Sequence, residues 1–157
     1  MEKMLNEYEL VLTKGKLSLK VQRRHNVSIN CIDEALKFLI KKYGLCNIAT
    51  EKAFVLSYDS EGNIIGFMQI GTGTDKKVTI PFNTAFKFLL LNNAYGCIFI
   101  HNHIKGTGLY PSDGDHVFHA KTLMLCEDLE IELYANIILQ NYDSYYDMVK
   151  NNLEVLE

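Results

Sequence analysis

The sequence predicts a layered α/β domain with a mixed β-sheet flanked by helices. Short apolar runs typical of buried strands, such as residues 53–58 and 96–100, alternate with longer stretches whose apolar residues recur at helical spacing. The chain of 157 residues has the length of one domain, and its 48% hydrophobic and 22% charged residues are typical of a globular protein. We therefore expect a single domain over residues 1–157.

The first part of the chain is expected to form two short strands and a helix. Residues 7–24 predict the strands, with a turn at Lys14-Gly15-Lys16. A helix is expected over about residues 32–43, where Ser28 or Asn30 can cap its start and Gly44 can end it. Its apolar positions at helical spacing are Ile32, Ala35, Leu36, Leu39 and Ile40.

The next segment predicts a β-hairpin. Residues 53–58 form the first strand, residues 59–63 have the composition of a turn, and residues 64–70 form the returning strand. The stretches Gly71-Thr72-Gly73-Thr74 and Gly106-Thr107-Gly108 lack the Lys-Ser/Thr ending of a phosphate-binding loop. We expect both stretches to be turns.

The second half of the chain continues the alternation. Thr79-Ile80-Pro81 is expected to open a helix that runs to about Asn93, and residues 96–101 form a core strand. A helix from Asp115 to about Leu129 and a strand over residues 131–140 follow. The tail from about Tyr142 to Leu156 is expected to be helical or partly irregular.

Charge and hydropathy argue against two kinds of partner. A formal net charge of −3 provides no electrostatic footprint for nucleic acid, and the brief basic cluster from Lys20 to His25 is expected to be a solvated surface. No apolar run approaches the length of a membrane span. We expect neither a nucleic acid nor a membrane partner.

The cysteines and the N-terminal segment favour a reducing, cytoplasmic location. The segment that begins Met1-Glu2-Lys3 has no signal-sequence pattern, and the cysteines include no Cys-x-x-Cys pair. Free, buried thiols are expected because unpaired cysteine packs as a small hydrophobic residue. The four cysteines are Cys31, Cys46, Cys97 and Cys126.

The stretch His101-Asn102-His103 carries the strongest indication of chemistry. Residues two apart on a strand point to the same face, so both imidazoles can reach one point in space. Asp115 follows after a short loop, and Ser112 can cap the helix that carries it. Two histidines and a carboxylate are a plausible ligand set for a catalytic zinc ion. The residues alone leave this interpretation and a structural histidine pair about equally favoured.

His119 adds an alternative. On a helix it shares a face with Asp115, four residues earlier, and it can therefore act as a ligand or support one. A histidine at the surface is the simpler expectation for this position.

The pattern His101-Asn102-His103 … Pro111-Ser112-x-x-Asp115 resembles the JAMM (MPN+) metalloprotease motif in its RadC-like form. The resemblance extends over roughly residues 30–150 and implies the JAMM/MPN-type fold, which is related to the cytidine deaminase fold. The further matching segments are Thr50 to Asp59, Ile70 to Gly73, Pro81 to Ala94, Ala135 to Leu139 and Tyr142 to Tyr146.

The resemblance also implies roles for individual residues. His101, His103 and Asp115 would hold Zn²⁺, Glu51 would be the general base, and Ser112 would stabilise the oxyanion. From the residues alone, Glu51 is a solvated carboxylate at the start of a strand. The function implied is that of a zinc-dependent metallopeptidase that cleaves a peptide or isopeptide bond.

Three departures from the family pattern leave alternatives open. Eight residues, Ile104 to Pro111, separate His103 from Ser112 where the family has seven, and Ile104 replaces a proline. Asn136 stands where many RadC-like chains carry a histidine. The alternatives are a non-catalytic binding module of the same fold and a DNA-repair-associated accessory protein. The sequence indicates neither a particular peptide or protein substrate nor an oligomeric state.

Overall fold

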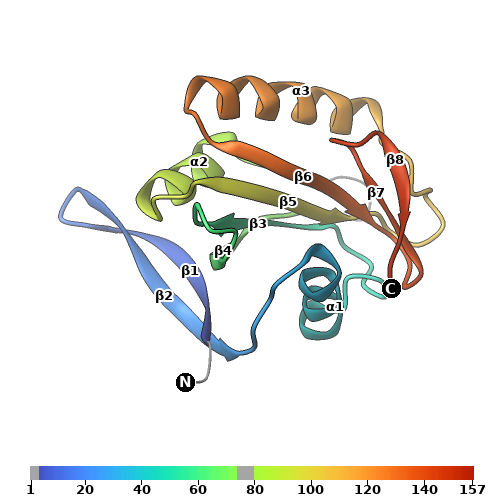
Figure 1. The fold of residues 1–157 in the computed structure, drawn as a ribbon, viewed down its shortest axis with the longest axis horizontal. Coiled ribbons are helices and arrows are strands. Elements are labelled where there is room, and N and C mark those ends of the chain that lie inside the picture. Colours follow the sequence, from blue (N-terminus) through green and yellow to red (C-terminus); the bar gives the residue numbers. More distant parts are fainter. Residues whose placement is uncertain (1–3, 74–79) are drawn as a thin grey trace.

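The computed structural model describes residues 4–73 and 80–157, which form an eight-stranded mixed sheet and three helices (Figure 1). The α/β class expected from the sequence is therefore confirmed. The helices are α1 (Ile32–Tyr43), α2 (Phe82–Leu91) and α3 (Asp113–Asp128). The strands are β1 (Met4–Thr13), β2 (Lys16–Asn26), β3 (Lys52–Tyr58), β4 (Ile64–Thr72), β5 (Gly96–Asn102), β6 (Glu132–Leu139), β7 (Ser144–Asp147) and β8 (Asn152–Val155).

The sheet places β5 near its centre. The strand order is β2-β1-β4-β3-β5-β6-β7-β8, in which β1 runs parallel to β4 and β5 runs parallel to β6. The other neighbouring pairs are antiparallel. Every residue of β5 is buried, because β3 and β6 flank it and helices cover both of its faces. The strand that carries His101 and leads directly into His103 is thus part of the buried core.

Two hydrophobic layers hold the helices against the sheet. On one face, α1 packs Leu36 and Leu39 against Ile100 and its neighbours. On the other face, where α2 and α3 lie, Phe88 and Cys126 pack with Phe99. Alternate residues of β5 therefore pack in opposite hydrophobic layers, as the two-residue period of a strand requires.

Helix α1 begins differently from the prediction. Its N-cap residue is Cys31, and no side chain caps it, so the assignment of Ser28 or Asn30 is wrong. Asn30 precedes the N-cap and instead donates from its backbone N–H to the Glu34 carboxylate at 2.6 Å. Gly44 ends the helix as expected, in the left-handed conformation at φ 67° that favours glycine.

The C-terminal tail is where the prediction fails most clearly. Instead of a helix or an irregular segment, β7 and β8 form a hairpin that extends the sheet beyond β6. Each of these strands has only four residues, which is too short for a periodic pattern to reveal. Strand β7 is placed by its pairing with β6 and by burial of Tyr145 and Tyr146, and β8 is placed by its pairing with β7.

The N-terminal hairpin of β1 and β2 is longer than expected and projects from the body of the molecule (Figure 1). The cluster from Lys20 to His25 lies on β2, and most of it is exposed as predicted. However, Arg23 and His25 each approach the buried carboxylate of Glu7 at 3.3 Å. Part of the basic cluster therefore neutralises a buried acid.

One cysteine and one glycine-containing stretch lie in different surroundings from those expected. Of the four free cysteines, Cys46, Cys97 and Cys126 are buried as expected, but Cys31 is exposed at the start of α1. Gly71 and Thr72 belong to β4 instead of a turn. Met1–Lys3, Thr74 and Thr79 lie outside the described residues.

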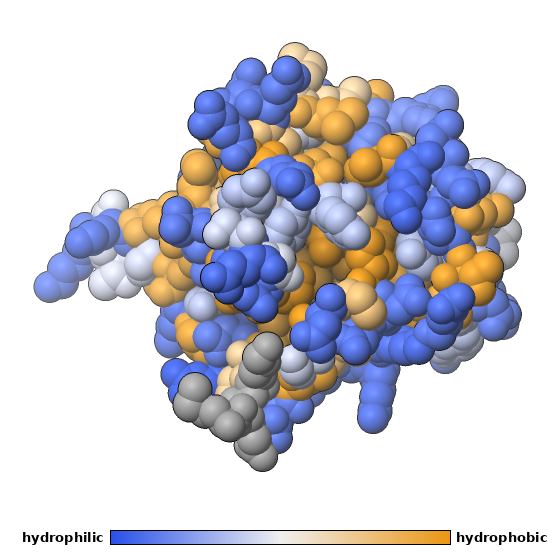
Figure 2. All heavy atoms as spheres, viewed as in Figure 1, coloured by the Kyte–Doolittle hydropathy of each residue, from blue (hydrophilic) through white to orange (hydrophobic). Residues whose placement is uncertain are grey.

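The surface exposes both hydrophilic and hydrophobic residues. Figure 2 shows hydrophilic residues over much of the visible face, with hydrophobic atoms between them. Within residues 4–73 and 80–157, no helix is long and apolar enough to cross a membrane.

Candidate metal centre

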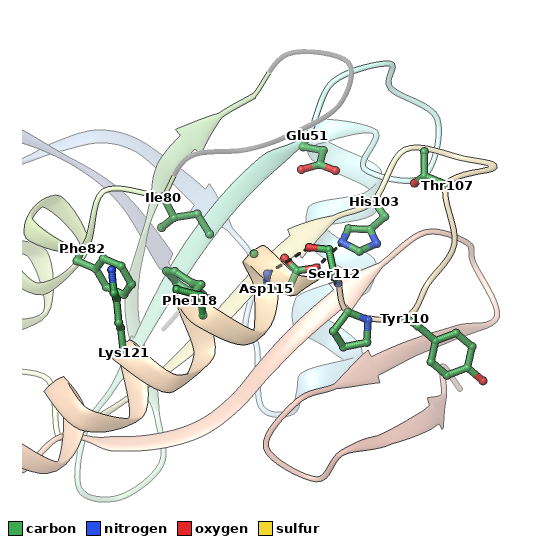
Figure 3. A pocket seen from close by; sticks show the side chains of 13 residues that line it. Glu51, Ile80, Phe82, His103, Thr107, Tyr110, Ser112, Asp115, Phe118 and Lys121 are labelled. Carbon is green, nitrogen blue, oxygen red and sulfur yellow. Dashed lines mark hydrogen bonds and ion pairs between the residues drawn. The ribbon is translucent and has the colours of Figure 1, made fainter.

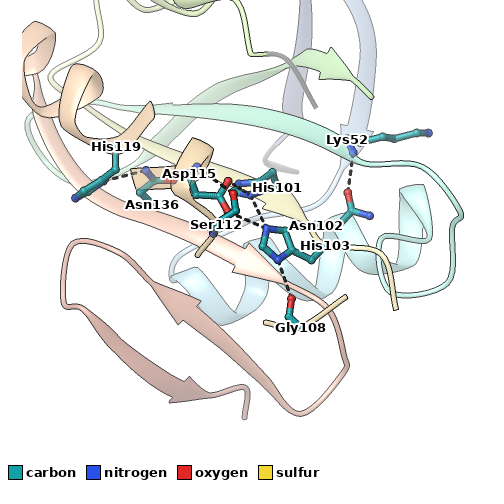
Figure 4. A network of polar contacts seen from close by, with 9 residues as sticks. All are labelled: Lys52, His101, Asn102, His103, Gly108, Ser112, Asp115, His119 and Asn136. Atoms are coloured by element: carbon teal, nitrogen blue, oxygen red, sulfur yellow. Dashed lines mark hydrogen bonds and ion pairs between the residues drawn. The ribbon is translucent and has the colours of Figure 1, made fainter. Parts of the chain in front are cut away.

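The end of β5 presents both histidines on the side of the sheet that α3 covers (Figure 4). His101 belongs to the same alternating set as Phe99, which packs in the layer under α2 and α3. His103 follows the strand directly, and its backbone N–H donates to the Leu139 carbonyl at 2.6 Å. This bond extends the β5–β6 pairing, so the two imidazoles stay on one face as the sequence predicted.

Helix α3 brings the carboxylate to them. Ser112 is its N-cap residue: the Ser112 hydroxyl accepts a hydrogen bond from the Asp115 backbone N–H at 3.2 Å. In return, the Asp115 carboxylate accepts one from the Ser112 backbone N–H at 2.8 Å. This reciprocal capping box fixes Asp115 in the first helical turn, where it points back at β5. The predicted capping role of Ser112 is confirmed.

The three side chains converge on one point. Asp115 Oδ1 lies 3.1 Å from His101 Nε2, and Asp115 Oδ2 lies 3.0 Å from His103 Nε2. The two Nε2 atoms are 3.3 Å apart. Ligands bound tetrahedrally to zinc at about 2.0 Å stand about 3.3 Å from one another, so these separations fit such an ion. This His-His-Asp group could hold a metal ion.

The orientation of His103 also suits a ligand. Its Nδ1 lies 2.8 Å from the Gly108 carbonyl oxygen, which can only accept a hydrogen bond. Nδ1 therefore carries a proton, and Nε2, which faces Asp115 and His101, is the ring nitrogen left to bind either a metal ion or a second proton. Both histidines are buried, at 2% and 8% exposure, so the attraction of the Asp115 carboxylate for a cation is screened little by solvent. Such a cluster favours a cation between its members.

The electrostatics agree with this geometry. Burial alone would raise the pKa of Asp115, but hydrogen bonds from His101 and His103 outweigh it and hold the pKa well below its usual value. Burial opposes protonation of His103, yet its contacts with Asp115 and the Gly108 carbonyl raise its pKa. A negative carboxylate is thus built into the site.

The longer loop between His103 and Ser112 does not separate the ligands. Gly106 and Gly108 adopt positive φ angles of 93° and 98°, which let the chain turn tightly. The Ile104 carbonyl accepts hydrogen bonds from Thr107 and from the Gln140 side chain. With this eight-residue loop, Asp115 still reaches both histidines.

Glu51 lies next to the same site, immediately before β3. Ala53 pairs with His101 in the β3–β5 ladder, and Glu51 precedes Ala53 by two residues, so it belongs to the same side of the sheet. The residue is 9% exposed and lines the cleft that also contains His103 and Asp115 (Figure 3). The structure therefore brings this residue, fifty positions earlier, to the candidate ligands.

Asn102 is a site residue that the sequence reasoning missed. It points away from the histidines, is fully buried, and accepts a hydrogen bond from the Lys52 N–H at 2.7 Å. Its amide also donates to the Thr50 carbonyl at 3.1 Å. In the sequence, the signal that could have identified Asn102 was its position between the two predicted ligands, His101 and His103.

A cleft of about 710 Å³ opens beside the candidate ligands (Figure 3). Glu51, His103, Ser112 and Asp115 line it, whereas His101 lies deeper in the core. The predicted site residues are thus together, four of them accessible from one cavity.

His119 lies outside this group. Its ring accepts a hydrogen bond from the amide of the buried Asn136, over 3.0 Å. Burial lowers the pKa of His119. His119 is half-buried against β6, so it is neither one of the converging ligands nor a fully exposed surface histidine.

Fold and site together define an α/β domain with a candidate His-His-Asp metal centre at the end of a central strand. The family model of the RadC-like JAB domain matches residues 29–153, and the chain belongs to this family. The β1–β2 hairpin lies outside the matched segment.

The chain is similar to two curated UPF0758 proteins. A UPF0758 protein of Thermotoga maritima is 27% identical over 128 residues, covering 79% of this chain and 57% of the relative. A UPF0758 protein of Alteromonas mediterranea is 29% identical over 102 residues, covering 65% of this chain and 43% of the relative. The chain spans about half the length of these relatives.

Proposed function

We propose that this chain is a zinc-dependent metallohydrolase that cleaves a peptide or isopeptide bond. One observation carries the proposal: His103 and Asp115, two members of a His-His-Asp group with metal-ligand spacing, share a cleft with the Glu51 carboxylate and the Ser112 hydroxyl. Membership of the RadC-like JAB domain family supports it.

His101, His103 and Asp115 would hold the ion. Bound zinc supplies a Lewis acid and lowers the pKa of water to about 7, so that a nucleophile is available at neutral pH. Two imidazoles and one carboxylate are a common ligand set of catalytic zinc sites, which keep a position for water or substrate.

Glu51 would move the proton. A carboxylate at the edge of the cleft can accept a proton from the attacking water and then donate it to the leaving amine. Amine departure requires this second transfer, because an unprotonated amide nitrogen is a poor leaving group. The burial of Glu51 beside the ligands supports this role.

Ser112 would stabilise the oxygen of the cleaved carbonyl. Its hydroxyl oxygen already accepts the Asp115 N–H, which leaves the hydroxyl proton for donation into the cleft. A single oxyanion donor of this kind contributes about 3 kcal/mol to the transition state.

We also propose that the protein works in a reducing compartment, the cytoplasm. The free cysteines support this location: the thiols of Cys97 and Cys126 lie 3.9 Å apart, share a hydrogen bond and form no disulfide.

The test is peptide hydrolysis by zinc-loaded protein, with a peptide library of whole-cell origin as substrate and mass spectrometry as the readout. Glu51→Gln should retain bound zinc and lose at least about 100-fold in turnover, as expected for loss of a general base. Glu61→Gln, which changes an exposed carboxylate in the β3–β4 turn, is the matched control and should leave turnover unchanged.

Two outcomes would contradict the proposal. Unchanged turnover in the Glu51→Gln protein would remove Glu51 from the mechanism. No cleavage by the zinc-loaded wild-type protein would favour the alternative of a non-catalytic binding module.

A further inference from the structure

The cleft beside the candidate metal centre continues along one face of α3. Asp115, Phe118 and Lys121 all line it, and residues three apart on a helix are neighbours on one face. At 1.5 Å per residue, the helix advances about 9 Å between Asp115 and Lys121. The cleft therefore has a defined direction, from the candidate ligands towards Lys121 (Figure 3).

The middle of this path is apolar. Ile80, Phe82 and Phe118 line it, and the rings of Phe82 and Phe118 stack with their centroids 5.0 Å apart. An extended peptide would thus pass an aromatic wall after leaving the candidate metal centre. Such a wall favours an apolar side chain.

The far end of the path carries a positive charge. Lys121 is the one lysine or arginine that the described residues contribute to the lining of the cleft. Its Nζ lies 5.6 Å from the centre of the Phe82 ring, and within residues 4–73 and 80–157 it forms no ion pair. The aromatic ring positions an ammonium group that remains open to an anion.

We propose that Phe82, Phe118 and Lys121 form a specificity subsite for peptides that present a carboxylate beyond an apolar residue. An extended chain advances about 3.3 Å per residue, so a distance of about 9 Å corresponds to roughly three residues. The substrate class is therefore a peptide with an apolar residue near the scissile bond and a carboxylate about three residues away. Its relevance to catalysis rests on the proposed function.

The carboxylate has two chemical sources, an Asp or Glu side chain and the C-terminus of a peptide. Binding of four short peptides separates them. The first pair is acetyl-Gly-Gly-Leu-Ala-Glu-amide and its Gln counterpart. The second pair is acetyl-Gly-Gly-Leu-Ala-Ala with a free carboxylate and with an amidated end.

Dissociation constants are measured by NMR titration of the full chain carrying Glu51→Gln, so that no peptide is cleaved. We expect at least one charged peptide to bind about two- to fivefold more tightly than its neutral partner, the range of an exposed ion pair. The pair that shows the difference identifies the source of the carboxylate.

Substitutions of lysine test whether Lys121 causes the preference for the charged peptide. Lys121→Met should abolish the preference, and Lys121→Glu should reverse it. Lys87→Met, which removes an exposed lysine of α2 outside the cleft, should retain it. Equal binding of charged and neutral peptides to the parent protein would overturn the subsite, as would a preference that survives in Lys121→Met.

Failure of the subsite can be told apart from failure of the proposed function. Zinc-dependent hydrolysis without a carboxylate preference overturns the subsite alone. A preference that depends on Lys121, in a protein without hydrolytic activity, supports the subsite and overturns the proposed catalytic function.

Discussion

The side chain of Asn102 holds the backbone on both sides of Glu51. It accepts the N–H of Lys52 at 2.7 Å (Figure 4). It also donates to the carbonyl of Thr50 at 3.1 Å. Asn102 itself lies between the two candidate histidine ligands, so one strand end positions both the ligands and the carboxylate. We infer that Asn102 is a positioning residue for Glu51.

Asn102→Ala should therefore lower turnover by loosening Glu51 while bound zinc is retained. It leaves a buried N–H and carbonyl without partners, which should reduce the free energy of unfolding by about 1–3 kcal/mol. The measurements are kcat and KM with denaturant unfolding, and the NMR shift of the Lys52 amide should change.

Asn92→Ala is the control for stability. The Asn92 amide accepts a hydrogen bond from the buried Ser57 hydroxyl, away from the cleft. This variant should lose stability without a fall in kcat. Equal falls in kcat for both variants would mean that Asn102 acts only through global stability.

Ser112 combines two roles that substitutions can separate. Ser112→Ala should cost about 1 kcal/mol of stability, because the Asp115 N–H loses its capping partner. Ser112→Asp restores a capping acceptor but has no hydroxyl proton, so it should keep the stability and lose turnover. Ser112→Thr should keep both. Full turnover in Ser112→Asp would exclude the hydroxyl from catalysis.

The sequence was sufficient for the core of the fold because its central elements have strong periodic patterns. Strand β5 is a continuous apolar run, and α1 repeats apolar residues such as Leu36 and Leu39 at helical spacing. The cap of α1 could not be predicted, since Ser28, Asn30 and Cys31 are close together and side-chain capping depends on the exact first residue.

The candidate site was predictable only in part. His101 and His103 followed from the two-residue period of a strand, and Asp115 followed from the cap at Ser112. Glu51 was expected only through the family resemblance, because its approach depends on the pairing of β3 with β5. The role of Asn102 depends on the same pairing, which no local pattern reveals.

Gly96 provides a test of packing at the opposite end of β5. A Cβ atom at this position would lie 2.1 Å from the ring of Tyr58, whose hydroxyl donates to Glu132 at 2.7 Å. Gly96→Ala should displace the ring and lower the free energy of unfolding by about 1–3 kcal/mol. Thermal or denaturant unfolding measures the effect.

Tyr58→Phe is the companion variant, because it removes the hydrogen bond to Glu132 and keeps the ring. It should cost less than Gly96→Ala. Bound zinc should not change in the folded state of either protein, since His101 lies at the other end of the strand. Stability unaffected by Gly96→Ala would contradict the close packing of Tyr58 on the strand.

The central claim is that His101, His103 and Asp115 bind one metal ion, and metal content after zinc loading and desalting tests it most directly. We predict one equivalent of zinc in the wild-type protein and almost none in His103→Ala. His116→Ala, an exposed neighbour of Asp115, and His119→Ala should both retain one equivalent. One equivalent of zinc in His103→Ala, or none in the wild-type protein, would contradict the account.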